Sequence, residues 1–299
     1  MKLVSFLTRH GPRLGALVTT GVLDLANAGT RLGRPLPDSM QKLIDAGPQI
    51  WDHARRVIEL SPEEDVTARR TLVAPLPRPI RLRDVNLFLE HMEKGLALLG
   101  KTMSPQFKRQ VIYYNADHLH VYGPNDDIPF PRQASWIDFE LEWACVVGVT
   151  GVNISRASAA DYIFGFCIFN DWSERGSQFP FMDANLGPGI GKDFANSLGP
   201  CIVTADEFPN PYALRMTAHV NDELWSSGTT SSMHWRFEDA IVALSVDRSL
   251  FAGEVLGSGT VLNGCGFELG RRLSYGDTVR LEVERIGTLQ NRVVEAQRT

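Results

Sequence analysis

The chain has 299 residues, of which 43% are hydrophobic and 22% charged, and its formal net charge is −5. This composition is typical of an ordinary globular protein with a sizeable core, and the negative charge argues against nucleic acid or an anionic membrane as the main partner. The four cysteines are widely spaced and form no C-x-x-C pair. Neither a zinc site nor a disulfide framework is therefore expected, and the thiols are predicted to be free and buried.

The chain begins with an apolar stretch, 2–8, that is predicted to be a strand. Arg9 and His10 interrupt this stretch too early for a signal peptide. No other stretch approaches the length of a membrane span. We therefore expect a cytoplasmic protein that makes no use of a membrane.

Residues 1–75 are expected to form a small N-terminal α+β module. A hairpin-like stretch at 14–26 is followed by a helix capped by Asp38 or Ser39, and a second helix is predicted over 49–60 from its apolar stripe. The proline-rich run 74–79 then reads as a stiff connector. We place the domain boundary there, with a second, catalytic domain over 76–299.

A helix is predicted directly after the connector, from Asp84 to Gly95. The separation of seven positions from Asp84 to His91 makes nearly two turns, which would place both on one face. A single histidine on an apolar helix face is more often a core residue than a catalyst. His118 and His120 also share a face, but no third ligand has a suitable spacing, so a surface or hydrogen-bonding role is favoured over metal binding.

The central stretch, 136–175, contains two apolar segments that are predicted to pair as strands. Residues 137–144 alternate strictly, so Glu140 and Glu142 would stand on one strand face, about 7 Å apart at their bases. An isolated pair of this kind usually belongs to a strand that faces water. Asp171, at the end of the second apolar segment, changes this interpretation, because paired strands would bring three carboxylates together. Ligation by oxygen alone suits Mg²⁺, Mn²⁺ or Ca²⁺.

A glycine-rich loop at 186–194 presents Lys192, and its spacing does not match a P-loop. Its glycines would let the backbone approach a ligand closely while the lysine supplies a positive charge. Residues 213–284 are predicted to be rich in strands, with one helix at 237–244. We expect fraying beyond Glu284.

These motifs, in this order, resemble those of the fumarylacetoacetate hydrolase superfamily over roughly residues 78–285. The motifs that carry the resemblance are Asp138-Phe139-Glu140-Leu141-Glu142, the run 170–178, the loop 186–194, and Gly257-Ser258-Gly259-Thr260. The resemblance implies an α+β, strand-rich fold built on a rolled mixed β-sheet. It also implies a homodimer and a divalent metal, Mg²⁺ or Mn²⁺ with Ca²⁺ as a further possibility.

The resemblance also implies a role for individual residues. Glu140, Glu142 and Asp171 match the metal carboxylates, and Asp84 matches an additional aspartate ligand. His91 matches a general base, with Glu268 as the glutamate that orients it. The remaining matches concern groups that bind the substrate or its oxyanion: Arg175, Gln178, Lys192 and Thr260.

Members of the superfamily act on β-dicarbonyl compounds and 2-oxo acids, whose shared difficulty is a carbanion next to a carbonyl. The resemblance leads us to predict a metal-dependent hydrolase that cleaves a C–C bond in a small β-diketo acid, such as an acylpyruvate, fumarylpyruvate or fumarylacetoacetate, in the catabolism of aromatic or related compounds. The Asp84–His91 pair favours hydrolysis. The alternatives are a metal-dependent 2-oxo acid decarboxylase, a tautomerase or isomerase, a hydratase, and a non-catalytic ligand-binding descendant.

Overall fold

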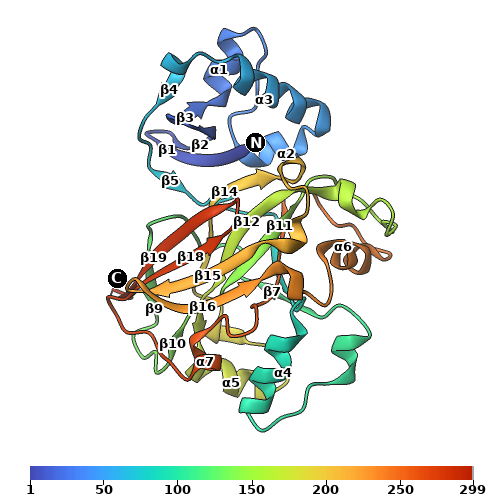
Figure 1. The fold of residues 1–299 in the computed structure, drawn as a ribbon, viewed down its shortest axis with the longest axis vertical. Helices are drawn as coiled ribbons and strands as arrows, with labels where there is room; N and C mark the ends of the chain where they lie inside the picture. Colours follow the sequence, from blue (N-terminus) through green and yellow to red (C-terminus); the bar gives the residue numbers. More distant parts are fainter. Residues whose placement is uncertain (298–299) are drawn as a thin grey trace.

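A large mixed sheet runs through the whole molecule, and the computed structural model describes residues 1–297 of the chain (Figure 1). The order of its twelve strands is β4-β3-β2-β1-β14-β12-β11-β17-β6-β7, with β5 paired to β1 and β8 paired to β14. The strands from the first part of the chain are β1 (Lys2–Thr8), β2 (Gly11–Val18), β3 (Gly21–Asp24), β4 (Val66–Thr67) and β5 (Leu72–Val73). The other strands of this sheet are β6 (Arg81–Val85), β7 (Tyr113–Ala116), β8 (Val121–Tyr122), β11 (Glu142–Val147), β12 (Ile163–Asp171), β14 (Asn196–Thr204) and β17 (Glu254–Gly257).

A second sheet has five strands in the order β16-β15-β18-β19-β9, and a short pair joins β10 to β13. The strands of these two sheets are β9 (Asp127–Phe130), β10 (Ile137–Asp138), β13 (Ser173–Glu174), β15 (Arg215–Val220), β16 (Glu223–Thr229), β18 (Thr278–Val283) and β19 (Gly287–Glu295). The predicted fraying beyond Glu284 is wrong, because β19 pairs with β18 and also with β9, far away in sequence.

Three helices cover the N-terminal end of the large sheet, and four others lie farther along the chain (Figure 1). The first group is α1 (Leu25–Arg31), α2 (Met40–Asp45) and α3 (Pro48–Leu60). The second group is α4 (Leu89–Leu98), α5 (Arg175–Asp183), α6 (Phe237–Ser245) and α7 (Gly266–Leu269). Ser39 caps α2 by accepting a hydrogen bond from the backbone of Lys42, as the sequence predicts. In the described residues, no helix combines the length and the apolar composition needed to cross a bilayer.

Both faces of the central strands β11 and β12 are buried, which explains why their sequences read as continuous apolar runs. On one face, Trp143 and Phe166 stack with their ring centroids 4.9 Å apart, in a core shared with the five-stranded sheet. On the other face, Phe164 meets Trp51 of α3 at 4.8 Å, in a core shared with the N-terminal helices. The predicted strand-rich α+β fold is confirmed, and these two cores fix the position of β11 and β12 between them.

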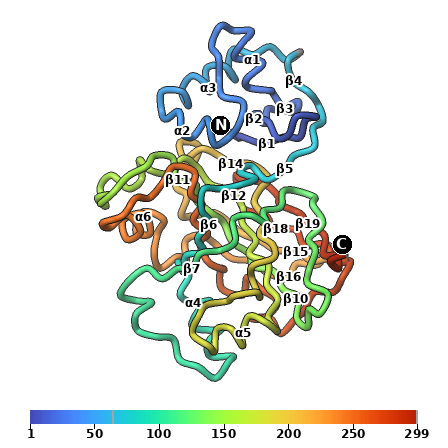
Figure 2. Tube along the Cα trace, turned by 180° about the vertical axis from the view of Figure 1, so that it is seen from behind, coloured from blue at the N-terminus to red at the C-terminus, as the bar shows by residue number. Residues whose placement is uncertain are grey.

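The N-terminal module is joined to the rest of the chain by sheet hydrogen bonds, because β1 pairs antiparallel with β14 (Lys2 opposite Val203, Leu3 opposite Ile202). The module boundary after residue 75 stays a prediction. At the far end of the molecule, α4 and α5 lie side by side, as both views show (Figures 1 and 2). The predicted site residues gather between this end and the large sheet.

Candidate active site

Four carboxylates converge at one end of the large sheet: Asp84, Glu140, Glu142 and Asp171 are all buried, and each offers an oxygen within 4.8 Å of the others. The pairing of β11 with β12 brings Glu142 opposite Phe169, two residues before Asp171. Asp84 arrives from β6, on the other side of β17. The sequence predicted three of these acids to meet through strand pairing. The structure brings all three together, with Glu142 and Asp171 placed by the pairing of β11 with β12 and Glu140 lying just before β11.

Two local predictions about these acids are wrong. The strand predicted over 137–144 is interrupted, because β10 ends at Asp138, β11 begins at Glu142, and Glu140 forms only an isolated bridge with Cys265. The helix predicted from Asp84 is also wrong, since Asp84 lies on β6 and α4 begins only at Leu89. Asp84 and His91 nevertheless line one cavity of about 110 Å³. A turn between strand and helix, rather than a shared helix face, brings them there.

Gly257 lies on β17, between β6, which carries Asp84, and β11, which carries Glu142. It is opposite Asp84 on one side and Ala144 on the other. A Cβ at this position would approach the Phe169 ring to 2.6 Å and Oε2 of Glu142 to 3.2 Å. Glycine therefore leaves the space through which the Glu142 side chain reaches the cluster.

Lys192 lies between two of the acids. Its Nζ donates to Oε2 of Glu140 and to Oδ2 of Asp171, both at 2.5 Å, and the side chain is 3% exposed. The residue follows a short 3-10 turn at Gly189–Gly191 in the glycine-rich loop. Tyr114 of β7, which the sequence gave no reason to select, also donates to Oδ2 of Asp171. Lys192 thus contacts two of the proposed ligands directly.

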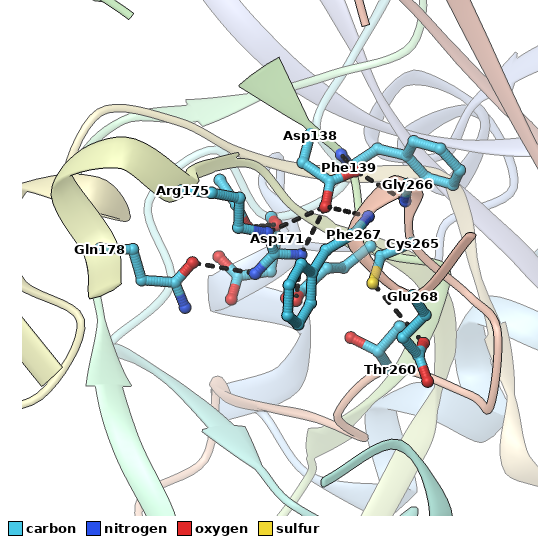
Figure 3. Close-up of polar contacts among 12 residues, drawn as sticks. Asp138, Phe139, Asp171, Arg175, Gln178, Thr260, Cys265, Gly266, Phe267 and Glu268 are labelled. Atoms are coloured by element: carbon cyan, nitrogen blue, oxygen red, sulfur yellow. Dashed lines mark hydrogen bonds and ion pairs between the residues drawn. The ribbon is translucent and has the colours of Figure 1, made fainter. Parts of the chain in front are cut away.

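Arg175 is buried among acceptors at the first turn of α5 (Figure 3). Its Nε donates to Asp138 at 2.8 Å, its Nη2 to Glu140 at 2.9 Å, and its Nη1 to Gln178 at 2.9 Å. Glu174 fixes the start of the helix by accepting hydrogen bonds from the two amides at 176 and 177. Each guanidinium nitrogen therefore donates to an acceptor within the protein, and Arg175 also lines a cavity of about 70 Å³. Its predicted role in binding substrate stays a prediction.

The remaining predicted residues lie around the same cavity. Thr260 donates to Oε1 of Glu142 at 3.2 Å and so contacts a proposed ligand. Nδ1 of His91 is 2.9 Å from Oε2 of Glu268, although the two atoms are not aligned for a hydrogen bond. His118 and His120 belong to neither of the residue groups, within residues 1–297, that could hold a metal. His120 instead contacts Asp117.

Burial and mutual repulsion raise the pKa of three of the acids, whereas nearby cations lower the pKa of the fourth. Burial, reinforced by the charge of Glu140, raises the pKa of Asp84 to about 6. Burial also raises the pKa of Asp171 to about 7, against the opposing effect of Lys192, and it raises the pKa of Glu142 well above its usual range. For Glu140, burial is outweighed by the charges of Lys192 and Arg175, which lower the pKa.

The residues present fit a hard divalent cation. Oδ1 of Asp84, Oε2 of Glu142 and Oδ1 of Asp171 are buried and have no hydrogen-bond partner in the described part of the chain. Buried oxygens without partners are costly, and a cation bound by them would remove that cost. An all-oxygen set of this kind is suited to Mg²⁺, Mn²⁺ or Ca²⁺. Asp84, Glu140, Glu142 and Asp171 would hold the ion.

A buried acidic cluster that shares a cavity with a histidine is an arrangement suited to metal-assisted catalysis. The chain belongs to the family described as fumarylacetoacetate (FAA) hydrolase C-terminal, whose model matches residues 85–294. The predicted superfamily is therefore confirmed, and its members are enzymes.

Individual relatives carry several names. The chain is 29% identical, over 303 residues, to the human protein named oxaloacetate tautomerase FAHD2A, mitochondrial; the match covers 98% of this chain and 92% of that protein. The structure of a fumarylacetoacetate hydrolase from Exiguobacterium antarcticum is similar, with a TM-score of 0.76, 26% identity, and coverage of 99% of this chain and 100% of that one. A maleylpyruvate hydrolase from Sphingobium sp. SYK-6, solved with manganese(II) and pyruvate, shares the fold with a TM-score of 0.75 at 23% identity, over 99% and 100% of the two chains.

Proposed function

We propose that the protein is a divalent-metal-dependent tautomerase that interconverts the keto and enol forms of a small 2-oxo dicarboxylic acid of the oxaloacetate type. The observation that carries the proposal is the shared cavity: His91 lines the same 110 Å³ space as Asp84, Glu140 and Lys192. Tautomerisation needs one base beside a centre that stabilises negative charge, and nothing more. The name of the human relative, which aligns over nearly the whole chain, supports this substrate class.

The chain's own residues divide the reaction between them. Neutral His91 removes a proton from the carbon next to the substrate carbonyl, and Glu268, 2.9 Å away, stabilises the imidazolium that forms. Lys192 faces the developing enolate oxygen with a permanent positive charge, because its contacts with Asp171 and Glu140 outweigh burial and raise its pKa. A bound divalent cation supplies further positive charge for the same oxygen. His91 then returns the proton to oxygen to complete the conversion.

The test follows the ultraviolet absorbance of enol oxaloacetate in chelated protein and after addition of Mg²⁺, Mn²⁺ or Ca²⁺. His91→Ala should lower the rate by about 10²–10⁴, the usual contribution of a positioned general base. Binding of Mn²⁺ should persist in this variant, because the carboxylates are unchanged. His118→Ala is the matched control and should retain the wild-type rate. Equal rates for the chelated and the metal-loaded protein would contradict the proposal.

A second candidate is the C–C hydrolase predicted from the sequence, acting on a β-diketo acid such as an acylpyruvate. The close contact of His91 with Glu268 favours it, since the same pair could remove a proton from water. The two candidates differ in their products. Incubation with acylpyruvates, fumarylpyruvate and fumarylacetoacetate should give pyruvate or acetoacetate only if hydrolysis occurs, and release of CO₂ from oxaloacetate would instead indicate a decarboxylase.

We also propose a homodimer in the cytoplasm, as the superfamily resemblance and the sequence lead us to expect. Analytical ultracentrifugation at several concentrations tests the assembly, and a concentration-independent monomer would exclude it. Imaging of the tagged full chain in its native cell tests the location.

A further inference from the structure

A second group of side chains that could hold a metal ion lies next to the acidic cluster. Two of its members act in the reaction proposed above, but that reaction gives no role to the three side chains together. It consists of His91, Cys265 and Glu268, which offer one nitrogen, one sulfur and one oxygen within 4.8 Å of one another. Sγ of Cys265 is 3.5 Å from Oε2 of Glu268, and Nδ1 of His91 is 2.9 Å from the same oxygen. Figure 3 shows the thiol pointing toward the glutamate.

Two atoms of this group are buried without a hydrogen-bond partner in residues 1–297: Nδ1 of His91 and Oε1 of Glu268. The Glu268 side chain is completely buried, so its unpartnered oxygen is costly. His91 is 14% exposed and lines two adjoining cavities, one of about 70 Å³ beside Phe267 and one of about 110 Å³ beside the acids. Of the three side chains, only His91 lines these cavities, so a small cation would reach the group past the histidine.

We propose that His91, Cys265 and Glu268 form a second metal site, which takes a zinc-like cation and thereby inhibits the enzyme. Zn²⁺ accepts nitrogen, sulfur and oxygen ligands together, commonly three from the protein and one from solvent. Tetrahedral bonds of about 2.0–2.3 Å place neighbouring ligand atoms roughly 3.3–3.7 Å apart. The sulfur–oxygen distance of 3.5 Å already fits. The 2.9 Å nitrogen–oxygen distance has to open by about 0.4 Å to reach the lower end of this range.

The two sites differ in chemical preference. The acidic cluster offers only oxygen and favours Mg²⁺, Mn²⁺ or Ca²⁺, whereas a thiolate selects softer cations. On binding, a bond forms between zinc and Sγ of Cys265, and the thiol proton leaves to solvent. The lone pair of Nδ1 of His91 is donated to the same ion, so the ring keeps its hydrogen on Nε2 and cannot accept another. The inhibition rests on the proposed role of His91 as the base, whereas the binding does not.

Spectroscopy of the full chain loaded with Mg²⁺ tests the binding. Addition of Co²⁺, a substitute for zinc, should produce a thiolate-to-cobalt charge-transfer band in the near ultraviolet. Cys265→Ala should lose this band, and Cys167→Ala, which removes another buried thiol, should retain it. Competition with a chromogenic chelator should show that Cys265→Ala weakens Zn²⁺ binding. The loss of affinity should exceed the roughly 10–100-fold that is typical when a residue that only hydrogen-bonds to a metal ligand is removed. Wild-type protein without the band would overturn the proposal.

The activity assay tests the inhibition. With Mg²⁺ saturating, Zn²⁺ should inhibit the wild type and Cys167→Ala but not Cys265→Ala, whose rate without zinc should equal that of the wild type. Equal inhibition of Cys265→Ala would place zinc in the acidic cluster and overturn the proposal. Cysteine-dependent binding without inhibition would support the site and overturn the role of His91 instead. Cys265→Ser, nearly equal in size, replaces the alanine variant if that variant does not fold.

Discussion

Replacing Arg175 by methionine distinguishes a structural role from a substrate-binding one. The side chain is 3% exposed and donates to Asp138, Glu140 and Gln178. Methionine preserves much of the volume but leaves Asp138, which is completely buried, without its cation. Removing one partner of a buried ion pair typically costs about 3–5 kcal/mol. At roughly 2–3 °C per kcal/mol for a long chain, the melting temperature should fall by about 6–15 °C.

The assay is thermal and urea denaturation of the metal-loaded protein, followed by circular dichroism, together with KM for oxaloacetate. Arg56→Met is the control, because Arg56 forms an exposed pair with Glu59 on α3 and such pairs contribute little. If Arg175→Met leaves the melting temperature unchanged and raises KM tenfold or more, the guanidinium binds substrate and the structural interpretation is wrong.

Three further results are expected. When Mn²⁺ is added at 100 times its Kd to wild-type protein that has been freed of metal by a chelator, denaturation experiments should show a stabilisation of about 2.7 kcal/mol. Glu142→Gln should lose most of this stabilisation. Equal stabilisation of the two proteins would exclude Glu142 as a ligand. Burial raises the pKa of Asp84 to about 6 and that of Asp171 to about 7, so protons should compete with the metal below these values. The Mn²⁺ affinity measured by calorimetry should therefore fall as the pH drops from 8 to 5.5. An affinity that does not change with pH would contradict this. Gly257→Ala should destabilise the protein by about 1–3 kcal/mol and weaken Mn²⁺ binding, since its methyl group would meet the ring of Phe169 and the carboxylate of Glu142. Wild-type affinity and stability in this variant would contradict the prediction and show that β17 can relax to make room for the methyl group.

The meeting of the acids was predictable because it depends on a local signal. Two apolar segments, each next to carboxylates, lie close in sequence and pair as neighbouring strands, β11 with β12. The proximity of Asp84 to His91 was predicted for an incorrect reason, since helical periodicity was read across a strand, a turn and a helix start. Strand β6 is held by β17, more than 150 residues away, and local periodicity carries no information about such a pairing.

Contacts between distant segments account for what the sequence did not reveal. Tyr114 reaches Asp171 from β7. Cys265 and Glu268 are neighbours at the start of α7, and the packing of α7 near α4 brings both to His91. Arg175 donates a hydrogen bond to Asp138, which lies 37 positions earlier in the sequence. A sequence motif identifies residue types that suit a chemistry. How many of a side chain's hydrogen-bond donors are already used within the protein can be seen only in the folded chain.

The pairing of β1 with β14 bears on how this enzyme can be shortened. Without the N-terminal module, the backbone groups of Ile202 and Val203 that now face Leu3 and Lys2 would lie along an open sheet edge. β14 is also the immediate neighbour of β12, the strand that carries Asp171. A fragment starting at residue 76 would thus present an open, apolar edge at these residues that invites pairing between copies. Expression of such a fragment is expected to give aggregates, and a soluble catalytic core would need that edge blocked by charged or proline substitutions.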